Sequence, residues 1–358
     1  MDTKLFRICE GFLPGGTIEK VVPLGIGNIN DSFLAEGKEK YVLQRINTDV
    51  FRDPSGVMKN IQLVCAHLEE KIRKEGKDPF RESLQFLPAV KDGTLLYTDE
   101  DGFCWRMYRY VDNVVTLQSI SSPAEAYRAA FAFGQFQSRL ADFDATRLSE
   151  TIPDFHNTEK RWETFLAAVK EDRAGRAEEV KDLIEQAYHL SYLAPRLTSL
   201  LASGELPVRV THNDTKINNI LFDKKTGDGI CVIDLDTVMP ATALYDFGDM
   251  IRSGANATDE EDTDLSRVSL DMEYYEAFYR GFMAGTEGRL TKTETENLGI
   301  SALVITFELA IRFLGDYLNG DVYFSIRTPR HNAERAANQL ALALDMEKKY
   351  EEMRKIVL

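Results

Sequence analysis

The stretch from His212 to Asn219 carries side chains whose types and spacing suit chemistry. It follows the pattern H-x-D-x-K-x-x-N, and the strand pair predicted after it ends at Asp234. Transfer of a phosphoryl group requires positioning, charge neutralisation and an acceptor for the proton of the attacking hydroxyl. Asp214 would orient that hydroxyl and accept its proton. The pattern therefore predicts phosphoryl transfer with Asp214 as the catalytic base.

Asn219 and Asp234 predict a magnesium site beside this base. Mg²⁺ prefers hard oxygen ligands and leaves its other positions to water and phosphate. Lys216 lies two residues beyond Asp214, as in protein-kinase loops, and would contact the transferring phosphate. The alternative is that these residues only cap turns. The apolar strand before Asp234 and the strand-rich region upstream favour the catalytic interpretation.

Neighbouring polar residues receive other predicted roles. Asn218 competes with Asn219 for the metal, and only the five-residue spacing from Asp214 selects Asn219. His212 is predicted to pack beneath the loop. Asp236 keeps two interpretations, because it would either hold a metal-bound water or end a solvated turn.

Asp246 begins the sequence D-F-G, which spells the metal-binding motif of protein kinases. It lies 32 residues beyond Asp214, whereas Asp234 lies 20 residues beyond it and directly follows an apolar strand. We therefore predict that Asp246 is a structural acid, which accepts backbone N–H bonds and braces the catalytic loop.

The elements that position these residues change in type along the chain. Turn signals and apolar patterning predict N-terminal strands at 18–24, 32–35, 40–46, 95–98 and 103–111. One helix lies between the two hairpins, with Asp53 as its cap and Pro54 at its first position. Its buried face should hold the apolar residues at helical spacing, which are Val57, Ile61, Val64, Leu68 and Ile72.

Beyond about residue 112 the pattern becomes helical. Ser122 and Glu125 predict a capping box, and further helices fit residues 158–172, 177–203, 267–285, 293–318 and 331–355. Strands at 219–222 and 230–235 interrupt them and carry the catalytic pattern. The fold class is therefore α+β in two lobes, with a β-rich N-lobe over 1–110, a helical C-lobe over 111–358 and the active site between them.

The residues predicted to bind the nucleotide lie in the N-lobe. Gly25, Gly27 and Asn28 lie between two strands, where glycines let backbone N–H groups approach phosphate oxygens. The third strand should carry a lysine that pairs with the phosphates, but Gln44 occupies that position. Arg45 is adjacent, although strand alternation directs it to the opposite face. Either Gln44 binds a phosphate, or a local twist lets Arg45 do so.

Together these motifs resemble those of the aminoglycoside phosphotransferase and choline kinase superfamily. More narrowly, residues 212–219, 232–240 and 313–324 (FLGDYLNGDVYF) resemble the N-acetylhexosamine 1-kinases of that superfamily. The resemblance implies a protein-kinase-like fold, ATP and Mg²⁺ as cofactors, and a small-molecule acceptor. It also implies that Arg312 and Tyr323 contact the sugar. From the residues alone, Arg312 would instead belong to a ladder of helix ion pairs with Glu308 and Asp316.

Composition narrows the classes of partner. Lys and Arg total 43 and Asp and Glu total 58, which gives a net charge of −15 over 358 residues. Such a chain repels polyanions, so we expect neither nucleic acid nor an anionic membrane as a partner. The four cysteines have no metal-binding or redox spacing, and the N-terminus has no signal-peptide pattern. We therefore expect a cytoplasmic protein, and the sequence leaves its oligomeric state open.

The sequence thus predicts an ATP- and Mg²⁺-dependent kinase for a small molecule, and the resemblance implies the anomeric hydroxyl of an N-acetylhexosamine as the acceptor. A choline, ethanolamine or homoserine kinase is the alternative within the superfamily. A pseudokinase-like nucleotide-binding module is the alternative from another class, suggested by the neutral Gln44.

Overall fold

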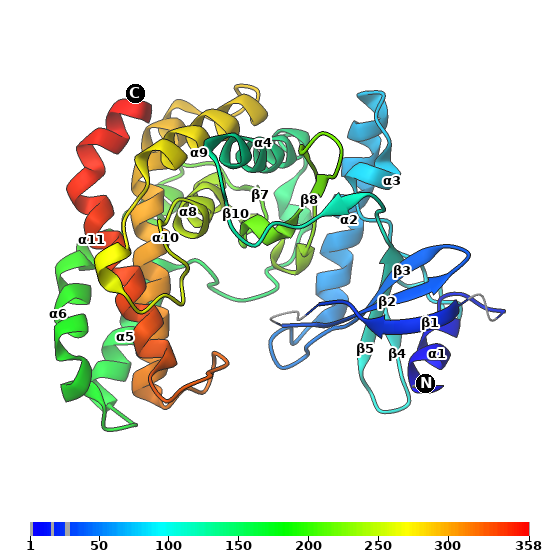
Figure 1. Cartoon of the computed structure of the whole chain (residues 1–358), viewed down its shortest axis with the longest axis horizontal. Coiled ribbons are helices and arrows are strands. Elements are labelled where there is room, and N and C mark those ends of the chain that lie inside the picture. The colour runs from blue at the N-terminus through cyan, green and yellow to red at the C-terminus, as the bar shows by residue number, and fades with distance from the viewer. Residues whose placement is uncertain (1–2, 16–17, 26–28, 358) are drawn as a thin grey trace.

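The computed structural model describes residues 3–15, 18–25 and 29–357. The chain forms a small lobe that contains a β-sheet and a larger lobe made mostly of helices (Figure 1). The predicted α+β class, with a β-rich N-lobe and a helical C-lobe, is confirmed. The last long strand of the N-lobe ends at Arg109, and Val114 already pairs with Asp223 of the C-lobe.

The N-lobe is built on a five-stranded antiparallel sheet with the strand order β1-β2-β3-β5-β4. Its strands are β1 (Ile18–Pro23), β2 (Asp31–Gly37), β3 (Lys40–Arg45), β4 (Tyr97–Thr98) and β5 (Cys104–Arg109). Its helices are α1 (Thr3–Glu10), α2 (Pro54–Lys74) and α3 (Pro79–Glu82). Asp53 caps α2 as predicted, because its carboxylate accepts the N–H of Gly56 at 2.9 Å. All five residues of the predicted apolar face of α2 are buried.

Helix α1 was not predicted from the sequence. It is eight residues long, and an isolated helix of that length is not stable in water. Its buried residues Ile8 and Cys9 belong to one apolar cluster with Trp105 and Met107 of β5. Packing on the sheet therefore stabilises a helix that its own sequence signals only weakly.

The C-lobe surrounds the catalytic segment with helices. These are α4 (Pro123–Arg139), α5 (Thr158–Glu171), α6 (Lys181–His189), α7 (Thr198–Ala202), α8 (Ala243–Gly254), α9 (Met272–Gly285), α10 (Lys292–Asn319) and α11 (His331–Val357). Two small sheets lie among them, one formed by β6 (Val114–Val115), β8 (Ile220–Asp223) and β9 (Gly229–Val232), the other by β7 (Arg209–Thr211) and β10 (Met239–Ala241). Short 3₁₀ helices are η1 (Ala145–Arg147), η2 (Ala177–Val180), η3 (Leu190–Leu193), η4 (Ile217–Asn219), η5 (Leu235–Thr237) and η6 (Leu265–Arg267).

Two helix predictions need correction. The helix expected over 177–203 is broken into η2, α6, η3 and α7. Pro195 lacks an N–H and accounts for the interruption between η3 and α7. The capping box at α4 forms only in half. Ser122 accepts the N–H of Glu125, but the Glu125 carboxylate accepts bonds from Ser121 instead of from Ser122.

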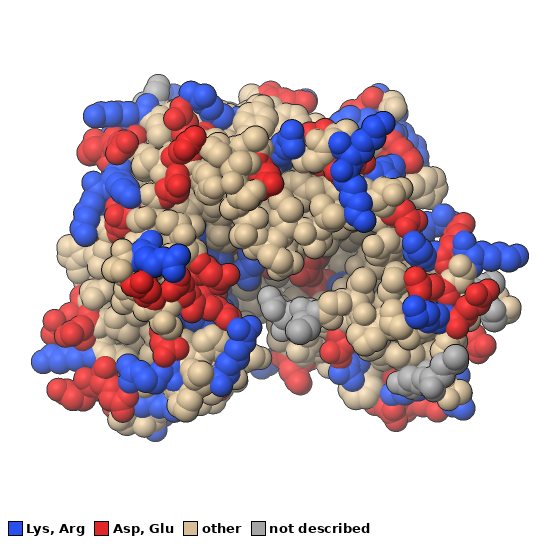
Figure 2. All heavy atoms as spheres, viewed as in Figure 1, with Lys and Arg blue, Asp and Glu red and all other residues tan. Residues whose placement is uncertain are grey.

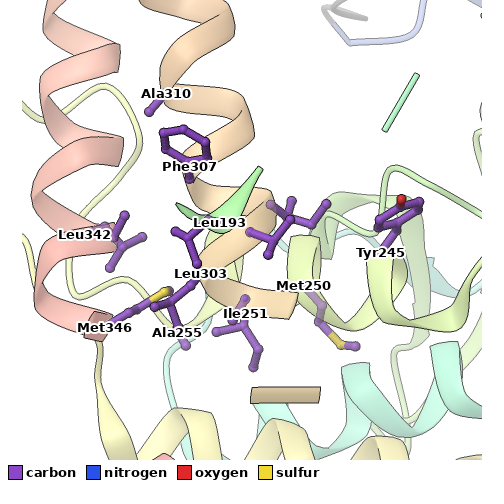
Figure 3. Packing of buried hydrophobic residues seen from close by; sticks show 14 of the residues in the cluster. Leu193, Tyr245, Met250, Ile251, Ala255, Leu303, Phe307, Ala310, Leu342 and Met346 are labelled. Atoms are coloured by element: carbon purple, nitrogen blue, oxygen red, sulfur yellow. The ribbon is translucent and has the colours of Figure 1, made fainter. Parts of the chain in front are cut away.

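Helix α10 runs through the centre of the C-lobe core. Leu303 and Phe307 of α10 meet Ile251 of α8 and Leu342 and Met346 of α11 (Figure 3). Among the described residues, α10 is also the one helix long and apolar enough to cross a membrane, but 89% of its most apolar window is buried inside the lobe. Its burial is that of a core helix.

Between the lobes the surface is hollowed, on the face that Figure 2 draws. Positive and negative side chains are interspersed over both lobes on that face (Figure 2). The excess of acidic residues is therefore not gathered into a single patch there.

Candidate active site

The catalytic segment lies between β7 and β8, where the side chain of Asn219 closes the loop. Its Nδ2 donates to the backbone oxygen of Asp214 at 2.9 Å and to Oδ2 of the same residue at 3.1 Å. Because the amide group is used in this way, the Oδ1 of Asn219 is the atom left to face a cation. Asn218 has its side-chain oxygen buried without a hydrogen-bond partner. The five-residue spacing thus brings Asn219, and not Asn218, to Asp214.

Asp246 and Asp249 of α8 hold the loop from beneath. Asp246 accepts the backbone N–H of His212 at 3.0 Å and that of Asn213 at 2.7 Å. Asp249 accepts the N–H of Thr215 at 2.8 Å. The predicted brace role of Asp246 is therefore confirmed, and Asp249 is a second brace that the sequence analysis did not identify.

The glycine of the D-F-G sequence serves helix packing. A Cβ atom added to Gly248 would lie 2.6 Å from the backbone oxygen of Ser301 in α10. Only glycine lets α8 approach α10 so closely, and this approach sets the depth of the two bracing aspartates.

His212 joins the catalytic loop to the strand that precedes Asp234. Its Nδ1 faces the N–H of Asp214 at 3.3 Å, so its Nε2 carries the proton and donates to the oxygen of Ile233 at 2.8 Å. The ring is fully buried between Phe133 and Phe136. The predicted structural role of His212 is confirmed, and its packing couples the base to the predicted metal ligand.

Lys216 extends toward the base. Its Nζ lies 3.5 Å from Oδ1 of Asp214, and the lysine side chain remains 37% exposed. The Asp214 carboxylate raises the pKa of Lys216. Burial opposes ionisation of Asp214, but the charge of Lys216 and the hydrogen bond from Asn219 help to outweigh it, and the pKa of Asp214 is lowered. The base is therefore ionised, with a cation placed next to it.

Asp234 adopts a left-handed backbone conformation with φ of 58° at the start of η5. Its carboxylate opens to solvent, yet the surrounding protein removes part of its hydration. This desolvation, together with the charges of Asp236 and Asp214, raises the pKa of Asp234 to about 6. The raised pKa reflects negative charge that the nearby side chains do not fully compensate.

These donors fit a magnesium ion bound together with phosphate. The described residues contain no group of three His, Cys, Asp or Glu side chains that could hold a metal by themselves. Mg²⁺ at nucleotide sites uses one or two protein oxygens and completes its shell with phosphate and water. Asn219 Oδ1 and the uncompensated carboxylate of Asp234 supply such oxygens.

Asp236 is buried and hydrogen-bonded, and it belongs to a network of side chains that joins the two lobes. It is buried, forms a salt bridge with the guanidinium of Arg106 on β5, and accepts the side-chain N–H of Asn30 at 2.6 Å. Arg106 donates from Nε to Oε1 of Gln44 at 2.9 Å, and Gln44 in turn donates to Ser32 at 2.9 Å. The solvated-turn interpretation of Asp236 is therefore wrong.

Arg106 is the residue that the sequence analysis missed. It lies opposite Gln44 in the β3–β5 register, so the charge absent from β3 is present on the neighbouring strand. It is one of the largest fully buried side chains in the described chain. The missed signal was a charged residue inside an otherwise apolar strand, which is costly unless it has a partner.

The other predicted nucleotide residues are only partly described. Gly25 has a φ of +68°, a conformation that favours glycine, whereas Gly27 and Asn28 lie outside the described residues. Arg45 pairs with Asp31 and lies over the ring of Phe103, on the face of β3 opposite Gln44. Binding of phosphate by any of these residues remains a prediction.

On the acceptor side, α10 does not form the ion-pair ladder that its spacing allows. Glu308 binds His156 and Thr158 at 2.8 and 2.7 Å, and Asp316 accepts three backbone N–H groups of residues 322–324. Arg312 pairs with neither acid. Its guanidinium lies 5.9 Å from the ring centre of Tyr323, a residue that is 57% exposed. The structure thus brings Arg312 and Tyr323 together, and their contact with a sugar remains a prediction.

Comparison with known proteins identifies the family. Residues 20–282 match the phosphotransferase enzyme family. The chain belongs to this family and is therefore a phosphotransferase of the aminoglycoside phosphotransferase and choline kinase superfamily, in agreement with the catalytic-loop pattern.

Solved structures share the fold at low sequence identity. A microcompartment-associated aminopropanol kinase aligns with a TM-score of 0.64 and 16% identity over 99% of this chain and 98% of that chain. A spectinomycin phosphotransferase in complex with ADP and spectinomycin aligns at 0.57 and 11% over 98% of both chains. A choline/ethanolamine kinase family protein from Mesorhizobium loti aligns at 0.54 and 16% over 100% and 99%. These likenesses show that the fold is the protein-kinase-like, two-lobed one.

Proposed function

We propose that this phosphotransferase is an ATP- and Mg²⁺-dependent kinase that phosphorylates the anomeric hydroxyl of an N-acetylhexosamine. The observation that carries the kinase chemistry is the placement of Asp214, Asn219 and Asp234 around one loop, with an ionised base next to Lys216. The four cysteines are unpaired buried thiols, which supports the proposed cytoplasmic location.

Each side chain has a definite task in this reaction. Asp214 accepts the proton of the acceptor hydroxyl, while its hydrogen bond from Asn219 fixes the direction of its carboxylate. Lys216 neutralises charge on the transferring phosphoryl group. A bound magnesium ion would supply further neutralisation of phosphate charge, held by Asn219 and Asp234.

On the nucleotide side, we propose that Arg106 replaces the missing lysine. Its guanidinium is held by Asp236 and Gln44, much as an ion pair orients a lysine. A planar guanidinium keeps its charge when buried and can serve several oxygens at once. Activity of the proposed kinase then does not require a cation at Gln44, which argues against the pseudokinase alternative.

Fewer observations support the proposed sugar acceptor than support the kinase chemistry. It is supported by the resemblance around residues 313–324 and by the adjacency of Arg312 and Tyr323, which offer hydroxyl-binding forks and an aromatic face. The choline and ethanolamine alternative is disfavoured at this site. A cationic acceptor requires an aromatic cage, and here Arg312 already lies over the rings of Phe155, Tyr323 and Phe324.

An acceptor screen that follows ADP release tests the proposal. We expect turnover with N-acetylglucosamine or N-acetylgalactosamine and none with their methyl glycosides, because blocking the anomeric oxygen removes the proton that Asp214 must accept. Turnover of choline, ethanolamine or homoserine without turnover of the sugars would contradict the acceptor. Equal phosphorylation of a methyl glycoside would move the reaction to another hydroxyl. Absence of ATP turnover with every acceptor would favour the nucleotide-binding module.

A further inference from the structure

Arg161 of α5 and Arg312 of α10 differ from the other arginines of the described chain. Every other arginine there either forms a salt bridge with an acid or is exposed at the surface. Arg161 and Arg312 are half-buried, and neither forms a salt bridge within the described residues. The charge of Glu308 acts on both arginines, but that carboxylate is engaged by His156 and Thr158. In a chain with an excess of acids, the lack of a salt bridge at both described arginines is a specific feature of the site.

The acids closest to Arg312 in the helix are engaged elsewhere. Glu308 lies one turn before it and is bound to His156 and Thr158. Asp316 lies one turn after it and holds the backbone of the following loop. Both carboxylates are therefore hydrogen-bonded to other groups, and neither forms a salt bridge with Arg312, although the charges of Glu308 and Arg312 still act on each other.

Arg161 is likewise without an acid. The charge of Asp154 acts on Arg161, and Asp154 lies seven residues before it in the sequence. The Asp154 carboxylate, however, is bound by Lys160 at 2.8 and 2.9 Å. Arg161 donates from Nε and Nη2 to the backbone oxygen of Phe155, at 3.3 and 3.1 Å. The carbonyl of Phe155 accepts two of the hydrogen bonds that the Arg161 guanidinium can donate, but it does not neutralise the positive charge.

The two guanidiniums share one neighbourhood. Arg312 lies 5.3 Å from the ring centre of Phe155, the residue whose carbonyl binds Arg161. Burial and the positive charge of Arg312 lower the pKa of Arg161, so the two charges act on each other. Two cations brought together in a half-buried place favour an anion between them.

This neighbourhood adjoins the catalytic loop. His156 follows Phe155 directly, and its Nε2 lies 3.0 Å from the backbone oxygen of Asn213, the residue before the base. Both arginines belong to helices of the C-lobe. An acceptor whose hydroxyl faces Asp214 would direct another part of its structure toward them.

We propose that Arg161 and Arg312 form a subsite for an anionic group, a carboxylate or a phosphate, carried by the acceptor away from the hydroxyl that receives the phosphoryl group. Guanidinium forks bind both groups through paired, charge-assisted hydrogen bonds. The inference rests on the proposed function only in placing the acceptor beside Asp214. It implies that an acidic or phosphorylated hexose is bound better than its neutral counterpart.

Binding measured by calorimetry in the Asp214→Asn variant tests this without turnover. Two matched pairs are compared, N-acetylglucosamine 6-phosphate with N-acetylglucosamine, and glucuronate with glucose. We expect at least one charged member to bind about tenfold or more tightly than its neutral partner, as hydrogen bonds to charged groups imply. The pair that shows the preference distinguishes a phosphate from a carboxylate.

Substitutions then assign the preference to the arginines. In the Asp214→Asn background, Arg161→Gln or Arg312→Gln should remove most of the preference for the charged ligand. Arg161→Lys or Arg312→Lys should retain part of this preference, because the positive charge is kept. Arg196→Gln, at an exposed arginine without an acid partner, is the matched control and should leave the preference unchanged. Thermal unfolding of each variant identifies any that has lost its fold. If a glutamine variant is unfolded, the lysine variants test whether the arginine charge causes the preference for the charged ligand.

Several results would overturn the subsite. If the arginines only contact hydroxyls, neutral and charged sugars will bind equally well, and that outcome contradicts the proposal. So does an equal loss for charged and neutral members, or an effect of one arginine without the other. Failure of the proposed function is seen separately. If no hexosamine is phosphorylated while the charged ligands still require both arginines, the acceptor assignment is wrong and the anion subsite stands.

Discussion

At the scale of single residues, the pKa values of two aspartates in the site, Asp214 and Asp234, are shifted in opposite directions by their neighbours. Asp214 lies beside Lys216, and its pKa is lowered. Asp234 has lost part of its hydration and lies near the acids Asp236 and Asp214, and its pKa is raised to about 6. Pairs of acids shifted apart in this way take different chemical roles. Asp214 is suited to act as a base, and Asp234 gains most from a bound cation.

Replacing the base should separate catalysis from nucleotide binding. Asp214→Asn is expected to lower the turnover number by about 10²–10⁴-fold, the usual contribution of a general base, while ATP affinity stays nearly unchanged. Steady-state kinetics and ATP titration check the two parts. Activity within a few-fold of the wild type would show that another group accepts the proton.

The two candidate metal acids make a second matched pair. Asp234→Ala should abolish productive use of Mg·ATP, because Asp234 is a proposed magnesium ligand. Little stability should be lost, because Asp234 is exposed. Asp246→Asn should mainly lower stability, because Asp246 is fully buried and accepts backbone N–H groups. Magnesium dependence of activity and chemical denaturation distinguish them. A stable Asp246→Asn protein that no longer responds to magnesium would show that the two roles are exchanged.

At the scale of elements, the pairing of β3 with β5 decides where the positive charge lies. The sequence alone suggests that Gln44→Lys restores a phosphate-binding charge. The structure reverses this expectation, because the new ammonium would replace the oxygen that accepts from Arg106. The new cation would lie beside the buried guanidinium of Arg106, which is already paired with Asp236, and two adjacent cations there are unfavourable.

We therefore expect Gln44→Lys to lower stability and to weaken ATP binding. Arg106→Gln should also weaken ATP binding. The double variant, which moves the charge from β5 to β3, should bind ATP better than the sum of the single effects predicts. ATP titrations of the four proteins form the double-mutant cycle. Tighter ATP binding by Gln44→Lys alone would show that Arg106 does not supply this charge.

The contact of His156 with Glu308 joins the start of α5 to α10, and it should make stability depend on pH. Burial disfavours the charged imidazole, but Glu308 outweighs it and raises the pKa of His156 above its ordinary 6.5. Burial likewise opposes ionisation of Glu308, but His156 outweighs it and lowers the pKa of Glu308 below its ordinary 4.5. The raised pKa of His156 adds stability that is full below pH 6.5 and lost above it. The lowered pKa of Glu308 adds stability that is full above pH 4.5 and lost below it.

The free energy of unfolding of the wild type, compared with that of His156→Gln, should therefore differ most between about pH 4.5 and 6.5. Urea denaturation across pH 4 to 9 measures the difference. A difference that stays constant with pH would mean that the contact is not an ion pair.

At the scale of the whole molecule, the buried salt bridge between Arg106 and Asp236 connects the lobes directly behind the proposed metal site. Arg106 belongs to the N-lobe sheet, and Asp236 lies in η5, directly after Asp234 and Leu235. The side chain of Asn30 donates to the same carboxylate. The position of the N-lobe is thus tied to that of Asp234 through one side chain.

Asp236→Ala should lower the free energy of unfolding by about 3–5 kcal/mol, because it leaves Arg106 buried without a partner. Replacing both residues, as Arg106→Met with Asp236→Leu, should recover much of the stability without recovering ATP binding. Chemical denaturation and ATP titration of the two variants check this. If Asp236→Ala lost less than about 1 kcal/mol, the pair would not hold the lobes together.

The sequence by itself determined the features that local geometry controls. The five-residue spacing brings Asn219 to Asp214, and Asp53 caps α2. Each depends on backbone geometry over a few residues, which spacing encodes directly. The strand predicted over 230–235 forms over Gly229–Val232, so it ends earlier than its apolar pattern, and Asp234 follows it two residues later.

Only the tertiary structure decided which distant side chains meet. Arg106 and Asp236 are 130 residues apart, and no local pattern in either segment indicates that they pair. Arg312 has acids one turn away on both sides and binds neither, because His156 and the loop after α10 engage them. An ion pair forms with whichever partner the packed core places nearest, and that choice depends on the positions of whole elements, which sequence spacing does not fix.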